Sequence, residues 1–157
     1  MLDAMITPWA DTVVTRHLPP ASVSDVAGIA RLLSVLARAL PLLEDAILCS
    51  RGRWEALDVT LAIITGQQQL WTADHDGEME AAAVTSVFQA PRMKVMNVVF
   101  LGGTGLKHWA HNEPMFVEWA KANGCSEMEI CDTRGGAWGR VLDPGWEPAH
   151  MVLRRSV

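Results

Sequence analysis

The sequence predicts a single α/β domain of mixed α+β architecture, in which helices come first and a mixed, mostly antiparallel sheet follows. In the first half, apolar residues recur at steps of three and four, as on the buried side of a helix. In the second half, from Val84 onward, a strand, a glycine turn, a helix and a second strand follow one another, which predicts a parallel strand pair joined by a crossover helix. A chain of 157 residues can bury one core, so residues 1–157 are taken as one domain.

The composition narrows the classes of function. A formal charge of −5 argues against nonspecific binding to nucleic acid, which needs a positive surface. The number of cysteines is odd and their spacing fits no disulfide framework, which indicates reduced thiols. No signal peptide is recognisable at the first residues, and charged residues and Pro41 interrupt the most apolar stretch. We therefore expect no membrane span and synthesis in the cytoplasm.

The N-terminal half begins with little pattern. Residues 1–20 predict either a first strand or an N-terminal arm. Asp25 then offers a side-chain oxygen to the free N–H groups of a helix start. The amphipathic helix that follows should break or kink at Pro41 and continue as a second helical piece to Leu48. A third helix, starting near Trp54, should end at a glycine C-cap.

A hairpin and a central strand are expected next. The segments 67–73 and 81–88 are short and rich in strand-forming residues, and residues 74–77 between them are typical of a turn. The apolar run Met93–Leu101 predicts a buried strand that stops at a glycine loop. This loop comprises Gly102, Gly103, Thr104 and Gly105.

The glycine loop allows two interpretations. At a strand-to-helix junction, free backbone N–H groups and the helix dipole can hold a phosphate, and glycine lets the backbone come close to it. Alternatively, the loop is a plain turn that needs a positive φ at one or two positions. The Rossmann and Walker spacings are absent, so the pattern alone does not choose between them.

The rest of the chain predicts a helix capped by Asn112 and started by Pro114, and then a strand from Met128 to Cys131. A short helix over 135–142 and a final strand over 151–153 complete the expected elements. Cys131 has no histidine beside it in the sequence, so we expect it to be a buried structural thiol rather than a nucleophile.

Few residues are candidates for catalysis. Ligands of open α/β sheets lie beyond the carboxyl ends of strands, where Asp132 can act as a base and Arg134 can hold an anion. Asn97, on the neighbouring strand, can orient a substrate carbonyl. Alternatively, Asp132 caps the next helix and Arg134 pairs with it at the surface.

Metal and interaction sites are less well indicated. His108 and His111 have a ligand-like spacing, but no third ligand is identifiable, so no metal is predicted. Four tryptophans lie in apolar patterns and are expected in the core. Trp138 and Trp146 lie in glycine-rich segments and are the candidates for an exposed contact with a partner.

Several short segments resemble a known family. These are Leu70-Trp71, Ala83-Val-Thr85, Gly102-Gly103, Glu118-Trp-Ala120, Gly124-Cys125 and Met128-Glu129, followed by a loosened Thr133–Trp138 segment. Together with the order of elements, they resemble small proteins of the GNAT (Gcn5-related N-acetyltransferase) fold that tailed bacteriophages encode. The resemblance covers roughly residues 54–142.

The resemblance also implies how a working site would be built. In active enzymes of this fold, the loop after the central strand grips the pyrophosphate of acetyl-CoA, a role that falls here on the glycine loop with Arg134. The polar residue that leads that loop in the family is replaced by Phe100, and the chain contains no tyrosine to protonate the departing thiolate. These departures favour a degenerate acyl-CoA site.

Three functions follow as hypotheses. The first is a non-catalytic virion or assembly component, made in the host cytoplasm, that binds other phage proteins and can form a homo-oligomer. The alternative is an acetyl-CoA-dependent N-acyltransferase acting on an amine, with Asp132 as base and Asn97 positioning the substrate. The third is an interaction module that acts through Trp138 and Trp146.

Overall fold

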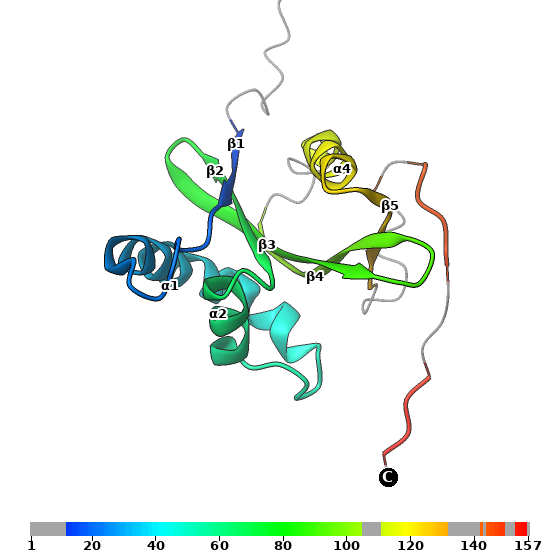
Figure 1. The fold of residues 1–157 in the computed structure, drawn as a ribbon, viewed down its shortest axis with the longest axis horizontal. Coiled ribbons are helices and arrows are strands. Elements are labelled where there is room, and N and C mark those ends of the chain that lie inside the picture. The colour runs from blue at the N-terminus through cyan, green and yellow to red at the C-terminus, as the bar shows by residue number, and fades with distance from the viewer. Residues whose placement is uncertain (1–11, 105–110, 132–141, 143, 150–152, 157) are drawn as a thin grey trace, which may run out of the picture.

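The protein folds into one sheet with helices on both faces (Figure 1). The computed structural model describes residues 12–104, 111–131, 142, 144–149 and 153–156. Its elements are, in chain order, β1 (Thr12–His17), α1 (Val26–Leu48), α2 (Ala56–Ile64), β2 (Gln69–His75), β3 (Glu78–Gln89), β4 (Lys94–Gly103), α4 (Glu113–Ala122) and β5 (Cys125–Ile130). The predicted helix over 135–142 and strand over 151–153 fall mostly outside the described residues.

The sheet has five strands in the order β1-β2-β3-β4-β5. The first three pairings are antiparallel and β4 pairs with β5 in parallel. Helices α1 and α2 cover one face and α4 covers the other, as Figure 1 shows. The predicted class, a mixed and mostly antiparallel sheet with one parallel pair and a crossover helix, is confirmed.

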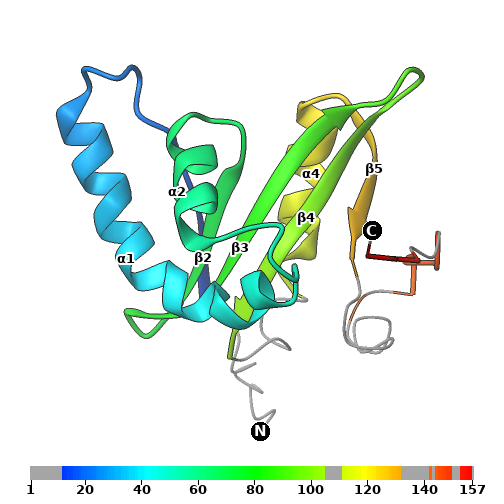
Figure 2. The same cartoon turned by 90° about the horizontal axis from the view of Figure 1, so that it is seen from below.

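Helix α1 begins at the predicted cap and supplies much of the core. The Asp25 carboxylate accepts hydrogen bonds from the backbone N–H groups of Gly28 and Ala21, at 2.9 and 3.0 Å. Every third or fourth residue of α1 is buried toward β3 and β4. Pro41 does not end the helix, because it lies on the exposed side, where the carbonyl that it leaves without a partner can face water. The axis changes direction in the last turns of α1 (Figure 2).

Among the described residues, α1 is also long and apolar enough to cross a membrane by length and composition. In the structure its buried residues belong to the core cluster that it forms with α2 and the sheet. The predicted absence of a membrane span stays a prediction.

The opposite face of the sheet is closed by aromatic packing under α4. Trp71 of β2 is 2% exposed, and its ring lies 4.7 Å from Phe116 and 5.5 Å from Trp119, between centroids. Its indole N–H donates to Thr85 Oγ1 at 2.9 Å, which satisfies the one polar group that this ring buries. The prediction that the tryptophan of this strand packs in the core is confirmed.

The sequence predicts either a first strand or an N-terminal arm within residues 1–20, and the structure shows a strand, β1. Residues 12–17 are a strand, which pairs antiparallel with β2 from Thr12 with His75 to His17 with Leu70. The expected order, with helices first, was therefore wrong at this point: a strand precedes the helices and forms one edge of the sheet. Residues 1–11 lie outside the described residues.

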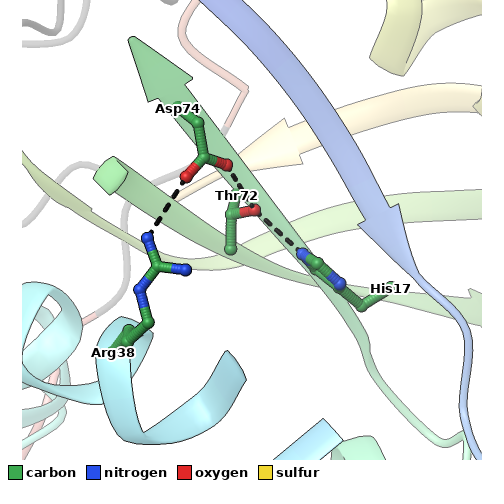
Figure 3. A network of polar contacts seen from close by, with 4 residues as sticks. All are labelled: His17, Arg38, Thr72 and Asp74. Carbon is green, nitrogen blue, oxygen red and sulfur yellow. Dashed lines mark hydrogen bonds and ion pairs between the residues drawn. The ribbon is translucent and has the colours of Figure 1, made fainter. Parts of the chain in front are cut away.

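A chain of polar contacts joins β1, β2 and α1 (Figure 3). His17 Nε2 lies 2.8 Å from Thr72 Oγ1, which donates to Asp74 Oδ2 at 3.3 Å. Because that hydroxyl gives its one hydrogen to Asp74, His17 must carry a hydrogen on Nε2. Arg38 of α1 completes the chain, with Nη2 3.5 Å from Asp74 Oδ1.

We expect this histidine to make the stability of the protein depend on pH. Burial lowers the pKa of His17 below its usual value of 6.5, with Asp74 opposing the effect and Arg31 adding to it. The unfolded chain then takes up the proton more readily than the folded one. The contribution of His17 to the free energy of unfolding is therefore fully present above about pH 6.5 and is lost as the pH drops through the pKa of the folded state. The urea midpoint should fall less between pH 7 and pH 5 in His17→Asn than in the wild type. An equal fall of the midpoint in both proteins would contradict this.

Candidate functional site

Strands β4 and β5 separate toward their carboxyl ends. They pair from Lys94 with Cys125 to Val98 with Ile130. Beyond this point β4 continues to Gly103, and within the described part of the chain it has no partner on the side of β5. Figure 2 shows the two strands diverging there. Among the described residues, nothing on the side of β5 pairs with the backbone N–H and C=O groups of this edge, which are the groups that a ligand could use.

A β-bulge marks the place of separation. Val84 of β3 pairs with Phe100 and Thr85 with Val98, which leaves Val99 as an extra residue in β4. Val99 and Phe100 both pack against the core cluster beneath α1. Two consecutive side chains therefore face the same side of the sheet, and the alternation between the two faces shifts by one residue. A bulged strand bends, and this bend accounts for the divergence of β4 from β5 directly after their last pair.

Two polar side chains lie at the start of the opening. Asn97 on β4 is the register partner of Glu129 on β5, one pair before the strands separate, and both are half-buried. The preceding pair, Met96 and Met128, faces α4, so Asn97 and Glu129 face the side of α1 and α2. Neighbouring strands lie about 4.8 Å apart, so one ligand atom can contact both side chains.

The glycines after the bulge are held in place by backbone contacts. A Cβ on Gly102 would collide with the carbonyl oxygen of Leu42 in α1, and one on Gly103 with the carbonyl oxygen of Glu80 in β3. Gly103 has a φ of +121°, as the turn interpretation requires. Strand β4 ends at Gly103, two residues further than the sequence predicted. Close contacts with neighbouring backbone, rather than a chain reversal, require glycine at both positions.

The rest of the predicted phosphate loop is described only in part. The Thr104 N–H donates to the Glu80 carbonyl at 2.9 Å, so this group is not free to bind an anion. Gly105 lies outside the described residues, and so do Asp132, Arg134 and Trp138. Cys131, which precedes Asp132, is exposed because β5 ends at Ile130. The expectation of a buried Cys131 was wrong.

Trp146, a predicted contact residue, is half-buried and engaged within the chain. Its indole N–H donates to Glu113 Oε1, in the first turn of α4, at 2.6 Å. This hydrogen bond ties the segment 144–149 to the start of α4. In the part of the chain that the structure describes, no group of three residues is arranged to hold a metal ion.

Glu129 is a site residue that was not among the candidates from the sequence. The predicted central strand over 93–101 contains no carboxylate, and nothing local distinguishes Glu129 from the other acidic residues of β5. Only the register of the parallel pair places Glu129 opposite Asn97. That register depends on residues far apart in the chain, which no local pattern reveals.

Several solved structures with a similar fold are described as acetyltransferases. One is an aminoglycoside acetyltransferase from an uncultured soil metagenomic sample, in complex with sisomicin, with a TM-score of 0.64, 8% identity and coverage of 94% of this chain and 97% of that one. A predicted acetyltransferase from Clostridium acetobutylicum with acetyl-CoA has a TM-score of 0.54, 12% identity and coverage of 92% and 96%.

A third similar structure is a ribosomal-protein-alanine N-acetyltransferase from Brucella melitensis, with a TM-score of 0.52, 15% identity and coverage of 92% and 99%. No protein-family model and no curated protein matches the chain. At these identities the likeness concerns the fold. The chain therefore has the GNAT acetyltransferase fold, with its diverging pair of parallel strands in β4 and β5.

Proposed function

We propose that this protein transfers an acetyl group from acetyl-CoA to an amine. The observation that carries the proposal is the free edge of β4 beyond Val98, with the Asn97–Glu129 pair at its start. The fold that the chain shares with acetyltransferases supports it. The alternative hypothesis from the sequence thus becomes the preferred one.

The free edge suits the amide-containing arm of acetyl-CoA. Backbone groups of Val99–Gly103 can hydrogen-bond to those amides as they would to a neighbouring strand. No charged side chain occurs along this stretch, so the edge can contact an uncharged arm without burying a charge. The pyrophosphate would lie beyond Thr104, toward residues outside the described part of the chain.

The chemistry then needs one base. Acetyl-CoA supplies the acetyl group as a thioester, and Asn97 can orient the reacting carbonyl. Glu129 accepts a proton from the amine, the nitrogen forms an amide bond with the carbonyl carbon, and the carbon–sulfur bond breaks to release a thiolate. A thiol has a pKa of about 8.5, so this sulfur can leave without a tyrosine to protonate it. Proximity of the two reactants supplies much of the rate.

A non-catalytic phage protein remains the second candidate, because the chain lacks a tyrosine and carries Phe100 where the family has a polar residue. None of the three solved structures named above is described as a phage protein. A virion role, partners among phage proteins and a homo-oligomer stay predictions. Detection of the chain in purified virions would support this candidate.

Calorimetry with acetyl-CoA tests the proposed function. We expect micromolar binding by the folded chain, and release of free thiol when an amine is added. Thiol release without amine measures hydrolysis and is the control. A folded protein that neither binds acetyl-CoA at millimolar concentration nor releases thiol would overturn the proposal. It would favour the second candidate, a non-catalytic protein.

A further inference from the structure

We propose that the amine acceptor carries an anionic group, a carboxylate or a phosphate, which Arg51 and Arg53 of the loop between α1 and α2 bind. The inference rests on the proposed function and names the class of its acceptor. Four features of the loop support it: its rigidity, its position, its backbone conformation and its unpaired charges.

The loop is a fixed structure. The Arg51 N–H donates to the Leu48 carbonyl at 3.0 Å, and the Arg53 N–H donates to the Ser50 carbonyl at 3.4 Å. Ser50 Oγ accepts from the Trp54 N–H at 3.2 Å and donates to the Trp54 carbonyl at 3.4 Å. Because these bonds hold both ends of the turn, the two arginines extend from a defined backbone.

The loop lies over the part of β4 that has left β5. Trp54 packs edge-to-face on Phe100, with 6.1 Å between ring centroids and an interplanar angle of 81°. The close approach of Leu42 to Gly102 brings the end of α1 onto the same stretch of β4. Figure 2 shows the loop crossing β4 on this face. Asn97 and Glu129 face the same side, so the loop and the proposed base border one surface.

Arg51 occupies a backbone conformation that disfavours arginine. Its φ is +55°, and that of the next residue, Gly52, is +78°. In this left-handed region an ordinary side chain costs roughly 1–2 kcal/mol, whereas asparagine or glycine adopts it more easily. The turn by itself would favour one of those residues. An arginine held there at a cost to stability indicates that its side chain is needed.

Neither arginine forms an ion pair within the residues that the structure describes, and both side chains are exposed. Asp58, the aspartate that follows in the chain, is engaged in capping α2, where Oδ2 accepts from the Glu55 N–H at 2.9 Å. Two guanidinium groups on a rigid turn fit an oxyanion, which each can bind through two hydrogen bonds.

The acceptor that fits this surface has a reactive amine at one end and a charge at the other. Its neutral amine lies near Glu129, and its anionic end lies near the loop. Phe100 is three residues along β4 from Asn97, or about 10 Å at the rise of a strand. The amine and the anionic group of the acceptor are therefore separated by several bonds.

A series of amines with one chain length tests the inference. Aminohexanoate, aminohexyl phosphate, aminohexanol and diaminohexane share the same amine and differ only in the far group. We expect kcat/KM for the carboxylate or the phosphate to exceed that for the alcohol by roughly tenfold or more. The combined change of Arg51→Asn and Arg53→Gln should remove this preference and leave the rate with aminohexanol unchanged. The better of the two anionic amines identifies the group.

Controls separate the inference from the proposed function and from a structural role. Arg92→Gln alters one exposed arginine in the β3–β4 turn and should keep the preference. Arg51→Asn should leave the melting temperature unchanged or raise it, whereas a merely structural arginine would lower it. Equal rates across the series, or preference for diaminohexane, with acetyl-CoA still turned over, would overturn the inference alone. Absence of both binding and turnover would overturn the proposed function and this inference with it.

Discussion

Replacing Glu129 by glutamine is expected to lower kcat for acetyl transfer by roughly 10²–10⁴-fold, the range that a positioned general base contributes. Glutamine keeps the size of the side chain and its place beside Asn97 but cannot accept the proton of the amine. The proposed binding of acetyl-CoA along the free edge of β4 does not need this carboxylate. The dissociation constant of acetyl-CoA from calorimetry should therefore change little, while kcat falls.

Glu127 provides the matched control. It lies two residues earlier on β5, pairs with Val95 and is exposed, so Glu127→Gln makes the same chemical change away from the opening. Its kcat should stay close to that of the wild type. If both variants, or neither, lose activity, then Glu129 is not the general base, and Asp132 becomes the candidate for that role.

The second large effect is on stability, at the glycines of β4. Gly103→Ala should lower the free energy of unfolding by about 3 kcal/mol, since overpacking typically costs 1–3 kcal/mol and the left-handed conformation adds about 1–2 kcal/mol. The obstacles are the Glu80 carbonyl and the backbone of Ala81, which cannot rotate away as a side chain can. Urea denaturation measures the change.

Two further glycine variants divide that effect into its parts. Gly77 has a φ of +78° and open space around its missing Cβ, so Gly77→Ala reports the conformational cost alone. Gly102→Ala reports the collision with the Leu42 carbonyl without a positive φ. Gly103→Ala should destabilise the protein more than either. If it costs no more than Gly77→Ala, packing does not require this glycine and a ligand role becomes the better explanation.

Local patterns predicted most of the elements. The spacing of apolar residues with an Asp25 cap gave α1, Asn112 with Pro114 gave the start of α4, and the turn at Asp76 and Gly77 joins the expected hairpin. Each of these signals lies within a few residues of the structure that it specifies. They also sufficed for the fold class, because the order of elements restricts how a sheet can be connected.

The site depends on contacts that local patterns do not contain. The bulge at Val99 and the pairing of Asn97 with Glu129 are set by register between strands. Gly102 was read as part of a phosphate loop because its contact, Leu42, lies in a helix far away in the sequence. Residues 1–20 left a first strand and an N-terminal arm both open, because only the pairing of β1 with β2, across the helices, decides between them.

The order of strands in the sheet also bears on how the chain folds during synthesis. Short turns connect β2, β3 and β4, whereas β1 and β5 join the sheet across the longer segments 18–68 and 104–124. Closing a longer loop costs more entropy, so the central three strands are expected to assemble first and the outer two to dock later. The opening exists only once β5 has paired with β4. A nascent chain whose residues 125–130 are still inside the ribosome is therefore expected to pair its central strands but not to form the candidate site.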